Sequence, residues 1–167
     1  MIIAIDVHYR NNMAKVVSIE FQNWEDETPM KIHSLIMPET PAYVPGQFYK
    51  RELPCLLEIL KLSDFSLIDL IIVDGHVVLD DAGKRGLGAY LYDAIGQKIP
   101  VVGAAKKSFH SLKEKTVAVL RGESKKALYI STIGVDLQEM AENIKKMHGD
   151  FRIPTLLKIL DVETKKE

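Results

Sequence analysis

The sequence predicts an α/β domain in which a mixed sheet is covered by helices. Apolar runs rich in β-branched residues open the chain at 2–5, 14–21 and 30–37, and turn residues separate them. Short runs of this kind are typical of an antiparallel meander. Beyond residue 47, stretches with helical periodicity alternate with short apolar strands, which is typical of βα crossovers. A meander followed by crossovers predicts a mixed sheet with helices on both faces.

Each later element follows from a local pattern. Leucines at helical spacing predict a first helix over 47–62, with Pro54 near its first turn, where a missing N–H costs little. The remaining expected elements are a strand at 67–73, a helix at 87–97, a strand at 101–102, a hairpin at 117–120 and 127–130, and helices from Asp136 to Met147 and from Pro154 to Val162. No repeat or linker divides the chain. We therefore expect one domain over 1–162, followed by a solvated tail at 163–167.

Composition excludes several classes of protein. The 167 residues suffice for one buried core, and the net charge of −1 argues against a protein that coats nucleic acid through bulk positive charge. The net charge does not exclude a nuclease, because clustered metal-binding carboxylates lower the net charge of such an enzyme. No apolar run reaches the length of a membrane span, and the N-terminus lacks the features of a signal peptide. The single cysteine, Cys55, is expected to pack in the first helix and is consistent with a cytoplasmic protein.

Candidate metal ligands follow two of the apolar runs. Asp6 and Asp74 each come directly after such a run, so both are expected to end a strand and to reach the same edge of the sheet. Two neighbouring carboxylates repel each other unless a cation lies between them, and oxygen ligands favour Mg²⁺ or Mn²⁺ over zinc. The alternative remains open that these acids cap turns. Considered alone, Glu52 and Asp161 are ordinary solvated helix residues.

Six segments, in order along the chain, resemble the endonuclease V family. They are Asp6-Val7-His8-Tyr9; Tyr43-Val44-Pro45-Gly46 with Arg51-Glu52; Val73-Asp74-Gly75; Val102-Gly103-Ala104-Ala105-Lys106-Lys107; Leu128-Tyr129-Ile130-Ser131; and Phe151-Arg152-Ile153-Pro154 with Leu157-Lys158-Ile159-Leu160-Asp161. The resemblance as a whole spans residues 2 to 161. One stretch departs from the family's pattern: residues 76–86 lack its usual His-Pro-Arg triplet, and His76 or Arg85 either substitutes for it or is an ordinary loop residue.

The resemblance implies a ribonuclease H-like fold and a Mg²⁺-dependent endonuclease, with Mn²⁺ as an alternative ion. Its partner would be DNA or RNA that contains inosine, cut on the 3′ side, with no membrane partner. The implied site consists of metal ligands Asp6, Glu52 and Asp74, with Asp161 completing the acidic cluster and Lys106 beside the scissile phosphate. The implied substrate wedge is formed by Tyr43, Val44, Pro45 and Gly46.

Two other interpretations stay open at this stage. One is a divergent relative that binds nucleic acid but cleaves it weakly or prefers another lesion, which the altered 76–86 segment favours. The other is an α/β binding domain whose acids are structural. The sequence does not distinguish DNA from RNA and leaves the oligomeric state open.

Overall fold

The computed structural model describes residues 1–38, 47 and 49–167 of the chain. Its strands are β1 (Ile2–Arg10), β2 (Met13–Phe21), β3 (Lys31–Pro38), β4 (Leu70–Asp74), β5 (Val101–Ala105), β6 (Val117–Val119) and β7 (Leu128–Ile133). Its helices are α1 (Tyr49–Leu60), the 3₁₀ turn η1 (Phe65–Leu67), α2 (Leu87–Ala94), α3 (Leu137–Lys146) and α4 (Thr155–Lys165). In this part of the chain none of the helices is long and apolar enough to cross a membrane.

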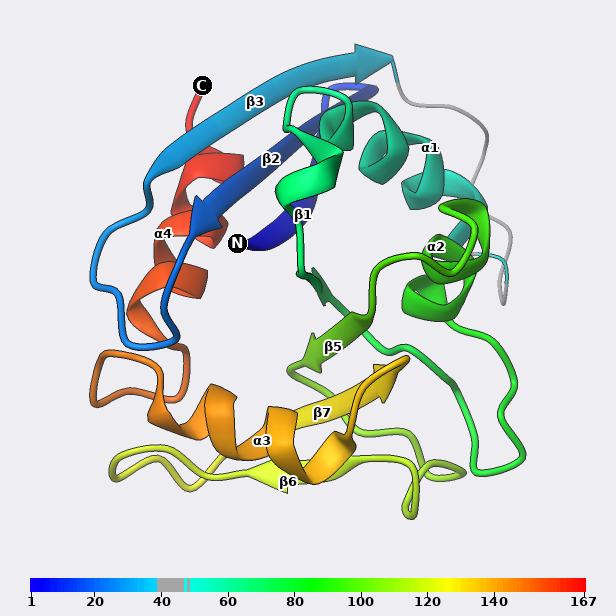
Figure 1. Ribbon diagram of the computed structural model, residues 1–167, viewed down its shortest axis with the longest axis vertical. Coiled ribbons are helices and arrows are strands. Elements are labelled where there is room, and N and C mark those ends of the chain that lie inside the picture. The colour runs from blue at the N-terminus through cyan, green and yellow to red at the C-terminus, as the bar shows by residue number, and fades with distance from the viewer. Residues whose placement is uncertain (39–46, 48) are drawn as a thin grey trace.

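The strands form one mixed sheet in the order β3-β2-β1-β4-β5-β7-β6 among the described residues (Figure 1). β1, β2 and β3 pair antiparallel, whereas β4 is parallel to both β1 and β5. Asn11 and Asn12 turn the chain between β1 and β2 with φ values of 52° and 60°, the left-handed pair that a two-residue hairpin requires. The expected meander and mixed α/β sheet are confirmed.

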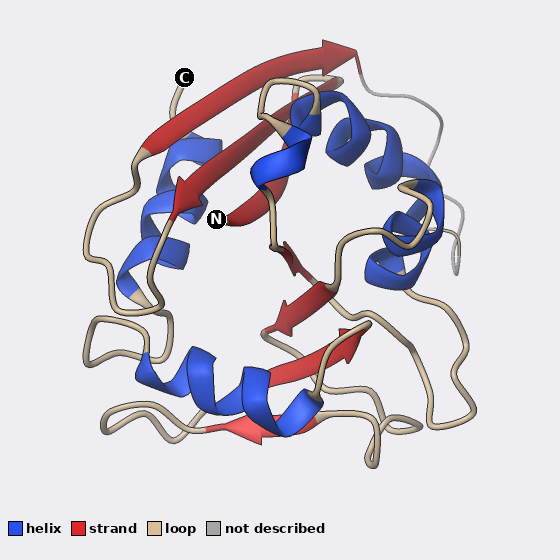
Figure 2. Ribbon diagram, viewed as in Figure 1, coloured by secondary structure: helices blue, strands red, loops and turns tan. Residues whose placement is uncertain are grey.

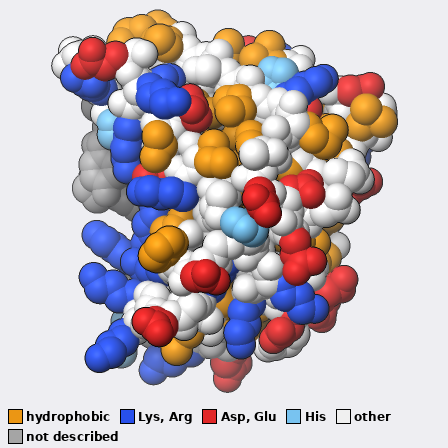
Figure 3. All heavy atoms as spheres, turned by 90° about the vertical axis from the view of Figure 1, so that its left-hand side faces the viewer, with side chains coloured by type: hydrophobic (Ala, Val, Ile, Leu, Met, Phe, Trp, Pro, Cys, Tyr) orange, Lys and Arg blue, Asp and Glu red, His pale blue; other side chains and the backbone are white. Residues whose placement is uncertain are grey.

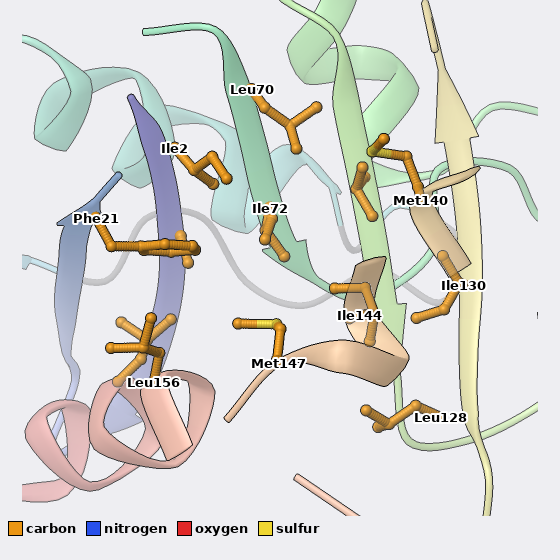
Figure 4. Packing of buried hydrophobic residues seen from close by; sticks show 14 of the residues in the cluster. Ile2, Phe21, Leu70, Ile72, Leu128, Ile130, Met140, Ile144, Met147 and Leu156 are labelled. Atoms are coloured by element: carbon orange, nitrogen blue, oxygen red, sulfur yellow. The ribbon is translucent and has the colours of Figure 1, made fainter. Parts of the chain in front are cut away.

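Helices cover both faces of this sheet because side chains alternate along each strand (Figure 2). Ile3 and Ile5 of β1 belong to the core beneath α1 and α2, whereas Ile2 and Ala4 belong to the core beneath α3 and α4. Figure 4 shows the second core, where Met140, Ile144 and Leu156 on the helices meet strand side chains such as Phe21, Ile72 and Ile130. Burying one such side chain contributes about 1.5–3 kcal/mol.

The expectation that Asp6 ends its strand is wrong. β1 continues to Arg10, and Asp6 pairs with Val17 in the middle of the hairpin with β2. The parallel neighbour β4, in contrast, stops at Asp74, and its last register pair with β1 joins Ile5 to Val73. Backbone pairing with β2 therefore sustains β1 beyond the point where β4 ends. Asp6 still lies at the carboxyl edge of the parallel part of the sheet.

Several element ends also differ from expectation. Leu67, expected as the first residue of a strand, belongs instead to η1, because Asp64 caps this turn through the Ser66 amide. α4 continues past Val162 to Lys165, and Thr164 is buried, so the solvated tail begins later than residue 163. The helix expected from Asp136 is confirmed as α3, and Asp136 caps its start by accepting a hydrogen bond at Oδ1 from the Glu139 amide at 2.8 Å.

Gly103 lets the segment after β4 lie close against β5. A Cβ at this position would stand 2.4 Å from the carbonyl oxygen of Gly75 and 2.9 Å from Oγ of Ser131. The same serine hydroxyl accepts a hydrogen bond from the Val77 amide at 2.9 Å. This close approach fixes the backbone that immediately follows Asp74.

We expect Gly103→Ala to lower thermal stability, because the added methyl group would collide with backbone atoms that cannot turn aside. Overpacking of this kind costs about 1–3 kcal/mol, which corresponds to a fall in Tm of roughly 2–12 °C for a chain of this size. Differential scanning calorimetry measures it. Ala118→Ser, at an exposed position of β6, is the control. Equal melting temperatures for wild type and Gly103→Ala would contradict the packing argument.

Candidate active site

Two aspartates lie abreast at the carboxyl edge of the sheet. Because Ile5 pairs with Val73, the next residues on the two strands, Asp6 and Asp74, are neighbours in the same register. Oδ1 of Asp6 accepts a hydrogen bond from the Val7 amide at 2.8 Å, and the Thr164 hydroxyl of α4 lies 3.5 Å from Oδ2. The Asp74 side chain is 42% exposed, so this carboxylate faces the open side of the site.

A third carboxylate reaches this edge from α1. Glu52 stands in the first turn of the helix, one turn before Leu56, and both side chains are buried on the face that packs against the sheet. The apolar stripe of α1 therefore carries Glu52 inward along with the leucine. Only 7% of Glu52 is exposed, in a place where an isolated carboxylate is costly.

The acids of this edge influence one another's protonation. Burial and, after it, the charges of Asp6 and Asp74 raise the pKa of Glu52 to about 8. Burial and then the charge of Asp74 raise the pKa of Asp6 to about 6. The pKa of Asp74 is also raised, mainly by desolvation, with Lys106 acting in the opposite direction. These shifts show electrostatic repulsion that either protons or a cation would relieve.

Lys106 and Asp161 complete the cluster. Lys106 directly follows β5, and its Nζ lies 3.8 Å from Oδ2 of Asp74 and 3.7 Å from Oδ1 of Asp161. On α4, Lys165 donates to Asp161 at 2.7 Å and Lys158 lies 3.6 Å away. Desolvation acts to raise the pKa of Asp161, but the hydrogen bond from Lys165 and the charges of the other lysines lower it overall. Asp161 is thus an ionised, lysine-paired carboxylate.

The structure therefore brings together all five residues that the sequence singled out for the centre of the site. Asp6, Glu52, Asp74 and Lys106 line one open cleft, and Asp161 borders an apolar pocket that shares Asp6, Asp74 and Lys106 with it. Within residues 1–38, 47 and 49–167, no group of three His, Cys, Asp or Glu side chains stands close enough to hold a metal ion. The oxygen-only donors and their mutual repulsion nevertheless fit a hard divalent cation.

The other residues that the sequence singled out are the four wedge residues, His76 and Arg85. The wedge residues Tyr43, Val44, Pro45 and Gly46 lie outside the described residues. His76 borders the cleft: its Nε2 lies 2.7 Å from the Lys107 carbonyl oxygen, and its ring packs against Phe109. Arg85 instead pairs with Asp93 of α2 at 2.9 Å.

Sequence reasoning assigned no role to Arg152 or to the lysines of α4. Arg152 donates hydrogen bonds to the carbonyl oxygens of Lys106 at 2.5 Å and of Ala127 at 2.7 Å. Backbone acceptors carry no sequence signal, so this contact could not have been found from the residues. Lys158 and Lys165, in contrast, stand at helical spacing from Asp161, and that spacing was a usable signal.

Comparison with known proteins gives a family match over almost the whole chain. The family model described as endonuclease V matches residues 1–161. The endonuclease V of Saccharolobus islandicus is 28% identical over 174 aligned positions, covering 99% of this chain and 81% of that protein. The endonuclease V of Ignicoccus hospitalis is 27% identical, covering 90% and 74% of the two chains.

Solved structures show the same fold. The crystal structure of Ciona intestinalis endonuclease V, in complex with a 24mer DNA containing an inosine followed by a ribo-adenosine, matches with a TM-score of 0.79 and 16% identity. The match covers 98% of this chain and 83% of that one. Human ENDOV matches with a TM-score of 0.74 and 23% identity, covering 98% and 82%.

We expect the metal-free protein to lose stability as the pH rises from about 4.5 to about 8. Burial and the neighbouring aspartates raise the pKa of Glu52 from 4.5 to about 8 in the folded state. In this window the folded protein holds a proton that the unfolded chain has released, so raising the pH favours unfolding. Melting temperatures measured in EDTA across this pH range should fall more steeply for wild type than for Glu52→Gln.

The control is Glu58→Gln, which removes a more exposed carboxylate from the same helix. Its curve should follow wild type. Parallel curves for wild type and Glu52→Gln would show that Glu52 does not carry this proton.

Proposed function

Because this chain belongs to the endonuclease V family, a family of nucleic acid endonucleases, we propose that it hydrolyses the phosphodiester bond 3′ to inosine in DNA or RNA with the help of a divalent cation. One observation carries the proposal: Asp6, Glu52 and Asp74 line one cleft at the carboxyl edge of the sheet, and Lys106 stands beside them. Mutually repelling carboxylates, with Glu52 buried among them, are expensive for a domain that only binds.

The proposed metal ligands are Asp6, Glu52 and Asp74. Their oxygens suit Mg²⁺ or Mn²⁺, and Asp6 and Glu52 have raised pKa values because burial and neighbouring carboxylates disfavour their ionised forms. These residues would hold the cation, which would supply Lewis-acid chemistry for phosphodiester hydrolysis when bound. The chain itself contributes the fixed spacing of Asp6 and Asp74, which their strands determine.

Lys106 is proposed to contact the scissile phosphate. Its ammonium group lies 3.8 Å from Asp74 and 43% of its side chain is exposed, so it can approach a phosphate without leaving the acids. Asp161 holds the lysine on its other side, at 3.7 Å. Because Lys158 and Lys165 already neutralise Asp161, this carboxylate positions Lys106 with little added repulsion toward the phosphate backbone.

Recognition of inosine is proposed from the family. The Ciona intestinalis relative is described with inosine-containing DNA, and the Tyr43, Val44, Pro45 and Gly46 segment of this chain resembles the wedge that helps a base leave the stack. Extrusion of a base costs a few kcal/mol, which an inserted apolar residue offsets. The His76 ring borders the cleft next to Asp74. It belongs to the segment 76–86, which lacks the family's usual triplet.

We expect wild type to nick an oligonucleotide that carries one inosine when Mg²⁺ or Mn²⁺ is present, and Asp74→Asn to lose at least about 100-fold in rate. The amide removes the negative charge that would hold the cation, while its shape is nearly unchanged. Denaturing gels of single- and double-stranded DNA and RNA substrates measure the rate and the position of the cut.

Asp69→Asn is the matched control. Asp69 directly precedes β4, so it lies at the other end of the strand from Asp74, and it pairs with the amino terminus. It should nick as wild type does. Wild-type turnover in Asp74→Asn would exclude this mechanism. Equal cutting with and without inosine would leave the nuclease and remove the proposed specificity.

A further inference from the structure

Phe151 presents a large apolar ring to solvent beside the site. It lies on the loop between α3 and α4 and is 79% exposed, more than any other large apolar side chain in the described part of the chain. This loop lies on the side of the molecule that faces the viewer in Figure 3. An open groove runs past the ring, lined by Gly122, Arg152, Ile153, Lys158 and Ile159 among others.

Hydrogen bonds from a buried arginine hold the backbone of the loop that carries this ring, and they form its framework. Arg121, which is 3% exposed, donates hydrogen bonds to the carbonyl oxygens of Met147, Gly149 (2.9 Å) and Phe151. A buried guanidinium is costly unless its donors are satisfied, so these bonds tie the loop to β6 and its turn. The following Gly122 lies so close that a Cβ would stand 1.9 Å from the Asp150 carbonyl oxygen. The exposed ring therefore stands on a backbone held in one shape.

Two contacts place the groove next to the proposed catalytic cleft. Arg152, the residue after Phe151, donates to the carbonyl oxygen of Lys106 at 2.5 Å. Lys158 lines the groove, and its Nζ lies 3.6 Å from Asp161. A strand of nucleic acid that leaves Lys106 on this side would pass directly over Phe151.

The charges around the ring favour a polyanion. Lys125 and Lys126 are exposed on the turn between β6 and β7, beside Glu123 and Ser124 of the groove. Together with Arg152 they outnumber the two acids of the groove, Glu123 and Asp150. Figure 3 shows Lys and Arg side chains gathered along one edge of this face. An exposed aromatic ring bordered by cations is the arrangement that binds single-stranded nucleic acid, with bases stacked on the ring and phosphates near the lysines.

We propose that Phe151 is a stacking platform for an unpaired base of the substrate strand, a few nucleotides from the cleavage position. The inference rests on the proposed function, since it assigns a path to the same substrate. The framework formed by Arg121 fixes the backbone beneath the ring, so a base that stacks on Phe151 restricts only the side chain of this residue.

The test uses single-stranded oligonucleotides with one inosine, in which 2-aminopurine is moved stepwise along the strand. Binding of wild type should quench 2-aminopurine fluorescence strongly at one position outside the cleft. Phe151→Ala should abolish that quenching and weaken binding, measured by fluorescence anisotropy, by about tenfold. Phe151→Trp should restore both, because indole also stacks. Phe65→Ala, which removes an exposed ring at the opposite edge of the sheet, should match wild type.

The outcomes separate the two proposals. If wild type nicks the inosine substrate and Phe151→Ala equals it in affinity and quenching, the stacking platform is excluded and the proposed function stands. If wild type neither nicks nor binds the oligonucleotides, the proposed function fails and the inference fails with it. Melting temperatures of Phe151→Ala and wild type should agree, since so exposed a ring contributes little to the core.

Discussion

The parallel pairing of β1 with β4 determines where the rest of the site must lie. The register that joins Ile5 to Val73 places Asp6 and Asp74 side by side on rigid backbone, where neither can move away from the other. Repulsion between them is then a fixed property of the fold. Every further group at this edge either adds to that repulsion, as buried Glu52 does, or reduces it, as Lys106 does. The negative charge of these carboxylates favours a cation at this edge of the sheet, with or without a substrate.

The two helical layers contribute opposite electrostatic components to this edge. α1 brings a carboxylate that is nearly without solvent, and its pKa is raised because burial and the aspartates disfavour the charged form. α4 brings Asp161 already paired with lysines of the same helix, which hold its pKa low against desolvation. The acid that would bind a cation and the acid that would orient a lysine are therefore distinguished by their surroundings, although both are carboxylates.

Much of this arrangement could be predicted from the sequence, and the exceptions have physical reasons. Asp6 and Asp74 follow apolar runs, so their common edge was predictable, although the hairpin that extends β1 past Asp6 was not. Glu52 and Asp161 look like ordinary helix acids, and only the family resemblance singled them out. The carbonyl contacts of Arg121 and Arg152 depend on which backbones the fold brings near. Leu67 looked like the start of a strand, because a short apolar run does not reveal the turn that Asp64 caps.

The alternation of side chains along β1 gives each face of the sheet its own core, and the site draws residues from both. Ile3 and Ile5 support the layer that carries Glu52, whereas Ile2 and Ala4 support the layer that carries Asp161. A packing change confined to one core shifts one helix and leaves the other in place. Substitutions of apolar core residues can thus change the pKa of Glu52 and the position of Asp161 beside Lys106 separately. An apolar substitution in one core is, on this view, a means of changing the surroundings of one acid while those of the other stay the same.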